Sequence, residues 1–175
     1  MPTLNRFPLL GLWAEEAARR AGFRRDEAES LGHAYAVLYA IRANRRPEPL
    51  AAKDHATAEH HRKSHRRGPR VHFGGDDLDV TRTADGHVRG HVGGDGAQTP
   101  ASYRRSVAGK FLPGYYERLQ KAFRRVLRGV RPKDLRERAV YDLYDEWKRT
   151  CGVGRRVDLD RLLEWCAERA GQRVA

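Results

Sequence analysis

The chain has 175 residues, with 35 Lys or Arg against 23 Asp or Glu, so its net charge is +12 and its pI about 10.3. This length suits one domain, or a modest domain with an appendage, and a balance this basic favours an anionic partner. The hydrophobic fraction of 39% is below average and the charged fraction of 33% is above average. No apolar run approaches the roughly 18 residues that cross a bilayer, and two cysteines build no disulfide framework, so we expect a bacterial cytoplasmic protein without a membrane partner.

The first segment, 1–46, predicts a helical hairpin. Apolar residues keep helical spacing after Pro8, and Gly22 is expected to end the first helix. The second helix is expected from about Asp26, where acidic residues suit its positive end, to about Asn44.

The next segment, 47–70, lacks aromatic and β-branched aliphatic residues and is rich in His and Arg. This composition predicts a flexible or weakly helical basic linker. Its histidines include His61 and His65, one helical turn apart, but no cysteine or closely spaced carboxylate completes an ordinary metal site, so no metal is expected. The linker instead offers mobile contacts for phosphates through Arg62, Lys63, Arg66, Arg67 and Arg70.

A small antiparallel β unit is expected over 71–98. Two alternating stretches flank Asp85-Gly86, a pair typical of a two-residue hairpin turn, and the VHFGG stretch ahead of them is a candidate third strand. This turn places Arg82 opposite Arg89. Like charges in direct opposition are unfavourable unless an anion or a nearby carboxylate compensates them, and both arginines join the candidate anion contacts.

The last segment, 99–175, predicts a block of three to four helices. Thr99-Pro100 suits a cap followed by a first helical position, and Asp158 suits a second cap. Helices are expected over about 100–109, 113–129, 132–150 and 158–171. The predicted fold class is therefore mainly α (α+β).

The helix over 113–129 carries the clearest functional signal. Wound at 100° per residue, it gathers its apolar residues on one side, which are Tyr115, Leu119, Ala122, Phe123, Val126 and Leu127. The opposite side carries Arg118, Lys121, Arg124, Arg125 and Arg128. The surrounding stretch, 103–138, has 12 basic and three acidic residues, a net charge of +9.

These patterns favour a non-enzymatic nucleic-acid-binding protein, nucleoid-associated or elsewhere in the cytoplasm, that neutralises backbone phosphates with little sequence specificity and needs no cofactor. The basic helix face supplies the main contacts, and Arg104 and Arg105 are expected to extend the same surface. The preference between DNA and RNA stays open. A solvated, Arg-rich surface is the alternative explanation of the same pattern.

Two further functions remain as alternatives. One is a protein-protein adaptor, or a scaffold that self-associates as a homodimer through the N-terminal hairpin. The other is a small metal-independent nuclease, because the spacings Arg67-x4-His72 and Arg82-x4-His87 resemble a motif of HEPN-class ribonucleases, in which the motif lies on a helix. Cys151 before a glycine-containing stretch is a weaker candidate nucleophile, since glycines commonly end helices.

Overall fold

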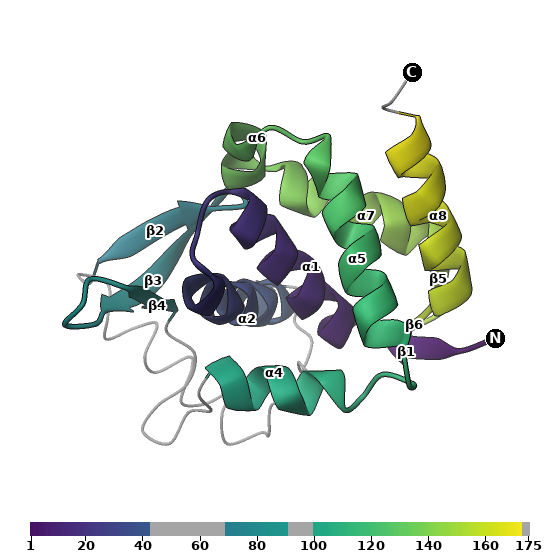
Figure 1. Cartoon of the computed structure of the whole chain (residues 1–175), viewed down its shortest axis with the longest axis horizontal. Coiled ribbons are helices and arrows are strands. Elements are labelled where there is room, and N and C mark those ends of the chain that lie inside the picture. Colours follow the sequence, from purple (N-terminus) through teal and green to yellow (C-terminus); the bar gives the residue numbers. More distant parts are fainter. Residues whose placement is uncertain (43–68, 91–99, 173–175) are drawn as a thin grey trace.

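The computed structural model describes residues 1–42, 69–90 and 100–172 (Figure 1). Within these ranges the chain forms seven helices and two antiparallel sheets of three strands each, which confirms the predicted mainly helical α+β fold. The predicted linker lies outside the described residues, apart from its last two positions.

The N-terminal hairpin is present as α1 (Arg6–Arg20) and α2 (Arg25–Arg42). Gly22 follows α1 with a φ of 100°, a left-handed conformation that glycine adopts without steric strain. The two helices approach closely at Gly32, where a Cβ atom would lie 2.7 Å from the backbone nitrogen of Glu15. A larger residue at this position would push the helices apart.

The β unit is a meander in the order β2-β3-β4. Its strands are β2 (Arg70–Phe73), β3 (Asp76–Arg82) and β4 (Val88–Gly90). The VHFGG stretch thus supplies a third strand, as the sequence suggests.

The predicted register of the β3-β4 hairpin is wrong by one residue. A two-residue turn would place Arg82 opposite Arg89, whereas Arg82 lies opposite Val88. The turn is longer because the Gly86 amide donates to the Thr83 carbonyl oxygen at 2.9 Å, and Gly86 takes a positive φ of 82°. The two arginines are therefore not in direct opposition, and no anion is needed to relieve them.

The C-terminal block is helical as expected, but one of its helices is divided. Its elements are α4 (Pro100–Ala108), α5 (Tyr115–Arg128), α6 (Pro132–Glu137), α7 (Ala139–Cys151) and α8 (Leu159–Gly171). The single helix expected over 132–150 is thus two helices. The predicted cap of α8 is confirmed, since the Asp158 carboxylate accepts from two backbone amides of the first turn.

The break between α6 and α7 falls at Arg138, which has a φ of −156°. The β2-β3 turn supplies the cause. The Gly74 amide donates to the Leu135 carbonyl oxygen at 3.2 Å, and the Gly75 amide donates to the Arg136 carbonyl oxygen at 3.0 Å. These carbonyl groups would otherwise accept hydrogen bonds from the next helical turn, so the turn of the sheet takes the place of a continuing helix.

A second sheet, which the sequence does not suggest, joins the two ends of the described chain. Its strands, in the order β1-β6-β5, are β1 (Thr3–Asn5), β6 (Arg156–Asp158) and β5 (Gly152–Val153). The β1 strand pairs antiparallel with β6, and the Leu159 amide donates to the Pro2 carbonyl oxygen at 2.9 Å. The start of the chain is thereby fixed beside the start of α8 (Figure 1).

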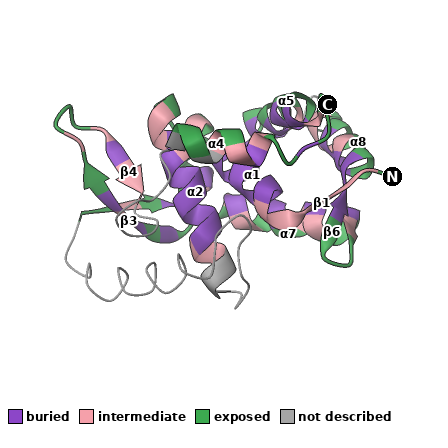
Figure 2. Cartoon of the chain, turned by 90° about the horizontal axis from the view of Figure 1, so that it is seen from below, coloured by how far each residue is buried: buried purple, intermediate pink, exposed green. Residues whose placement is uncertain are grey.

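Buried side chains from both halves of the chain form one continuous core around α1. Trp13 packs edge-on against Phe123, with ring centroids 4.9 Å apart, and its indole N–H donates to the Val140 carbonyl oxygen at 2.9 Å. Figure 2 shows buried residues along both α1 and α2. Residues 1–42 and 100–172, which fall in separate segments in the sequence analysis, thus share packed surfaces in space.

Candidate nucleic-acid interface

The α5 helix has one buried face and one exposed face, as its sequence predicts. Its buried residues are Tyr116, Leu119, Gln120, Phe123, Val126 and Leu127. Its exposed residues include all five predicted cations, Arg118, Lys121, Arg124, Arg125 and Arg128. Tyr115 departs from the expected inward position, because it is only partly buried and its hydroxyl donates to Asp160 of α8 at 2.6 Å.

Arg124 differs from the other four cations because it holds a buried carboxylate. Its Nε and Nη2 atoms donate to the two carboxylate oxygens of Glu16, at 2.7 and 3.2 Å. The Glu16 side chain is 1% exposed, while that of Arg124 is 45% exposed. The bond to Glu16 raises the pKa of Arg124 above its ordinary value. Arg124 is thus engaged in joining α5 to α1.

The other four cations form no ion pair with any described residue, and we call them the α5 cations: Arg118, Lys121, Arg125 and Arg128. At about 1.5 Å of rise per residue they extend over about 15 Å of the helix. The Arg118 guanidinium lies over the Tyr115 ring, 5.0 Å from its centroid. Glu117, in the first turn, is the one carboxylate that α5 itself contributes.

A groove of about 260 Å³ lies between α5 and α8. Both helices run away from the β1-β6-β5 sheet, side by side (Figure 1). Residues from both helices line the groove, namely Arg118, Lys121, Ala122, Arg125, Leu163, Cys166 and Ala167. Three of the α5 cations thus stand along one wall, and the α8 wall is apolar.

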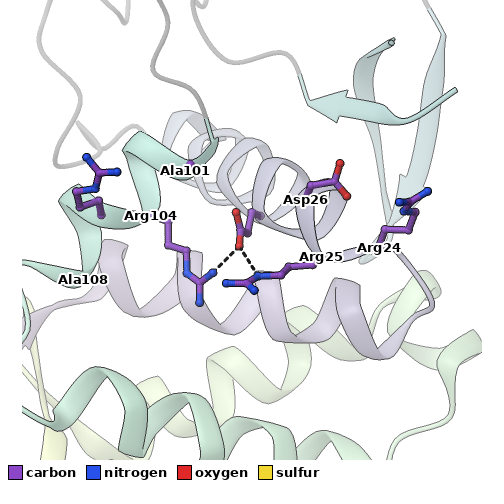
Figure 3. Close-up of a pocket in the computed structure, with 8 residues that line it drawn as sticks. Arg24, Arg25, Asp26, Ala101, Arg104 and Ala108 are labelled. Carbon is purple, nitrogen blue, oxygen red and sulfur yellow. Dashed lines mark hydrogen bonds and ion pairs between the residues drawn. The ribbon is translucent and has the colours of Figure 1, made fainter. Parts of the chain in front are cut away.

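Arg104 and Arg105 do not extend this surface, contrary to the prediction. Arg104 bonds to the Tyr116 hydroxyl at 3.1 Å, on the buried side of α5, and pairs with Glu29 of α2. Arg105 is exposed. Both arginines line a separate pocket between α2 and α4, together with Arg24 and Arg25 (Figure 3).

Three of the predicted contacts lie in the β unit, namely Arg82, Arg89 and Arg70, the last residue of the predicted linker, and two of them pair with carboxylates. Arg70 pairs with Asp79 at 3.0 Å, and Arg89 pairs with Asp26 at 2.8 Å. Arg82 is exposed at the end of β3 and has no ion pair with a described residue. The predicted linker contacts lie outside the described residues, and they are Arg62, Lys63, Arg66 and Arg67.

The His87 ring, a candidate for nuclease chemistry, is held between two carboxylates. Its Nδ1 atom lies 2.8 Å from Asp26, and its Nε2 atom lies 3.4 Å from Asp85. The hydrogen bonds from His87 and Arg89 hold the pKa of Asp26 well below its usual range. Because both ring nitrogens face carboxylates, the geometry directs neither nitrogen toward an approaching substrate.

A buried polar cluster between α1, α2 and α4 was not identified from the sequence. Glu15 is 5% exposed and His33 is 7% exposed, and both line a small enclosed cavity that Arg104 and Tyr116 also border. Burial raises the pKa of Glu15 from 4.5 to about 7 and lowers that of His33 from 6.5 to about 3. The one available sequence signal is the adjacent pair of glutamates within an otherwise apolar helix face.

The remaining candidate sites have simple outcomes. Cys151 and Cys166 are both buried, and burial raises the pKa of the Cys151 thiol to about 11, which leaves it a weak nucleophile. Among the described residues, no group of His, Cys, Asp and Glu side chains has the arrangement of a metal site. In the same residues, no helix combines the length and apolar character needed to cross a membrane.

No known family model, curated protein or solved structure matches this chain.

Proposed function

We propose that the protein is a non-enzymatic nucleic-acid-binding protein that contacts backbone phosphates through the α5 cations. The observation that supports this proposal most directly is that these four exposed cations on one helix face form no ion pair with a described residue. Three of them carry guanidinium groups, whose planar donors match phosphate oxygens. Phosphates that bind such a surface release counterions from both partners, which favours association.

The hydrogen bonds and ion pairs of the groups next to the α5 cations argue against a surface that is charged only for solubility. Arg124 has a buried carboxylate partner from α1, while Asp160 of α8 accepts a hydrogen bond from the Tyr115 hydroxyl. Glu16 and Asp160 thus have other partners, and the α5 cations form no ion pair with either of them. The opposite face of α5 is buried, so this helix offers one row of charge, which supports backbone contact better than base reading.

A salt titration of duplex binding tests the proposal. With four phosphates neutralised, affinity should fall roughly 100-fold between about 50 and 200 mM salt. A triple variant, Arg118→Gln, Lys121→Gln and Arg125→Gln, should bind more weakly and lower the slope of log affinity against log salt by about three. Parallel titrations with DNA and RNA duplexes of one sequence would determine the preferred nucleic acid.

A matched control removes the same charge elsewhere. Arg131, Lys133 and Arg138 have side chains that are 79%, 78% and 80% exposed, and they lie around α6. Their triple Gln variant should keep most of the duplex affinity. If the two triple variants lose affinity equally, net charge rather than the α5 surface drives binding, and the proposal is wrong.

The groove beside α5 favours one alternative, a protein adaptor. Its apolar α8 wall opposite a cationic wall would suit a helix that presents acidic and apolar residues together. Copurification of a defined protein that persists after nuclease treatment and a high-salt wash would support the adaptor. Nucleic acid in the purified protein that a high-salt wash removes would support the leading proposal.

A further inference from the structure

A second cationic site lies between the first turns of α2 and the α4 helix (Figure 3). It is an open pocket of about 550 Å³, a size typical of small-ligand sites. Its lining residues are Arg24, Arg25, Asp26, Glu29, Ala101, Arg104, Arg105 and Ala108. The pocket is separate from the α5 surface, because Arg104 bonds to Tyr116 on the buried side of that helix.

One carboxylate positions two of the arginines in this pocket. The Oε1 atom of Glu29 accepts a hydrogen bond from Arg25 Nε at 3.2 Å and another from Arg104 Nη1. Because the two guanidinium groups contact the same oxygen atom, they lie side by side, and Figure 3 shows them directed toward each other. The bond to Glu29 uses only the Nε atom of Arg25, so its terminal N–H groups can bind a ligand.

The pocket keeps an excess of positive charge after its own carboxylates are counted. Four guanidinium groups line it, against the carboxylates of Asp26 and Glu29. Asp26 is also paired with Arg89 and contacts His87, so its charge is largely balanced from the β unit. Arg24 and Arg105 form no ion pair with a described residue. The start of α2 adds the positive end of a helix dipole.

We propose that this pocket binds the phosphate group of a phosphate monoester. A monoester phosphate carries up to two negative charges and three terminal oxygens, which match an excess of two cations and the terminal N–H groups of Arg25 beside the Arg104 guanidinium. The methyl groups of Ala101 and Ala108 on α4 give the pocket a small apolar wall for the organic part of the ligand. Two sources have this chemistry, a free nucleoside 5′-monophosphate and the 5′-phosphorylated end of a nucleic-acid strand. The site does not rest on the α5 surface.

Calorimetric titration of the full chain tests the site with a nucleoside 5′-monophosphate and with the matching nucleoside. The monophosphate should bind and the nucleoside should not. A double variant, Arg25→Gln and Arg105→Gln, should weaken monophosphate binding at least tenfold, whereas Arg131→Gln with Lys133→Gln, which removes equal charge around α6, should not. Both pairs are exposed, so circular dichroism should confirm an unchanged fold.

The variant Arg25→Lys distinguishes the contribution of guanidinium geometry to the affinity from the contribution of positive charge. This variant keeps the charge but presents a single ammonium group, so its affinity should lie between those of the wild type and Arg25→Gln. The proposal is overturned if the wild type fails to bind the monophosphate at millimolar concentration. Equal weakening by the pocket variant and the α6 control would overturn it as well.

Two strand ligands identify the source of the phosphate. If a single strand with a 5′-phosphate binds more tightly than the same strand with a 5′-hydroxyl, and the pocket variant removes the difference, the ligand is a strand end. If the strands bind equally while the mononucleotide still binds in the pocket, the ligand is a free nucleotide. The triple variant of the α5 cations should retain mononucleotide binding; loss of duplex affinity alone in that variant concerns the α5 surface and leaves the pocket proposal unchanged.

Discussion

Burial shifts the pKa values of Glu15 and His33 in opposite directions, although the two residues belong to one cluster. The folded-state pKa of Glu15, about 7, is above its ordinary value of 4.5, so stability falls as pH rises through that interval. The folded-state pKa of His33, about 3, is below its ordinary value of 6.5, so stability rises as pH rises through that interval. Between about pH 4.5 and 6.5 the two effects oppose each other. The charged groups around Glu15 are Glu16, Arg19, Glu29 and Arg104.

The variant Glu15→Gln isolates the first titration. It keeps the shape of the side chain and removes the penalty for a buried carboxylate, which reaches about 3 kcal/mol above pH 7 for a shift of this size. The variant should therefore resemble the wild type at about pH 4.5 and exceed its free energy of unfolding increasingly up to about pH 8. Urea denaturation at several pH values measures the difference. A difference that does not change with pH would contradict the raised pKa.

Residue-scale features were predictable where their cause is local. The Asp158 cap depends on amides two and three residues ahead of it in the chain, so the sequence reveals it. The pair between Arg124 and Glu16 joins positions that are 108 residues apart, and no local spacing indicates it. The pair between Arg104 and Glu29 of α2 is likewise distant in the sequence, so the sequence places Arg104 on the α5 surface instead.

At the scale of the helix, α5 combines a structural role and a proposed binding role in adjacent residues. Arg124 points toward α1 and holds Glu16, whereas Arg125 lines the groove with α8. Successive residues are 100° apart around a helix, which is enough to direct them to different neighbours. Amphipathic spacing identifies which residues are exposed, but it does not distinguish a paired cation from an unpaired one.

Two single variants of α5 should therefore affect different properties, one stability and the other duplex binding. Arg124→Gln leaves the buried Glu16 carboxylate with one ion-pair partner among the described residues, Arg19 at 3.5 Å. It should lower the free energy of unfolding by about 1–2 kcal/mol, a modest loss because Arg124 is partly exposed to solvent. Arg125→Gln should leave stability nearly unchanged and weaken duplex binding. Denaturation curves and binding titrations on both variants test the pair. If Arg124→Gln and Arg125→Gln lose duplex affinity equally, Arg124 is also a phosphate contact.

Most helices could be predicted from the sequence, whereas the break between α6 and α7 and the short strand β1 could not. Helical periodicity, glycine stops and caps correctly indicated α1, α2, α4, α5 and α8. The break at Arg138 depends on hydrogen bonds from Gly74 and Gly75, which come from a distant turn. Strand β1 is three residues long, and its partner strand lies at the far end of the sequence, so it leaves no periodic pattern to detect.

For the whole molecule, the shared core makes the two helical regions dependent on each other. Trp13 of α1 is fully buried against Phe123 of α5 and bonds to the backbone of α7 at Val140. The hairpin and the C-terminal block therefore cannot separate without exposing these aromatic side chains. Segment boundaries in the sequence reflect changes of composition, which carry no information about which faces meet.

Unfolding should accordingly occur in one transition for the described elements. Trp13 lies in the hairpin, whereas Trp147 and Trp165 lie in the C-terminal block, and all three are buried. Tryptophan fluorescence and far-ultraviolet circular dichroism should give the same midpoint in urea, because a single core is lost at once. A Trp13→Phe variant should show the same coincidence at a lower midpoint. Two separate transitions would indicate that the hairpin and the C-terminal block fold independently.

The pairing of β1 with β6 also has a consequence for biosynthesis. The first strand and α1 emerge from the ribosome early, but their partners, among them α5, α7 and β6, are translated more than 90 residues later. Until then α2 is the main described element that covers the apolar stripe of α1. We expect nascent chains arrested before residue 150 to be captured by holding chaperones and released once the final helix has emerged from the exit tunnel.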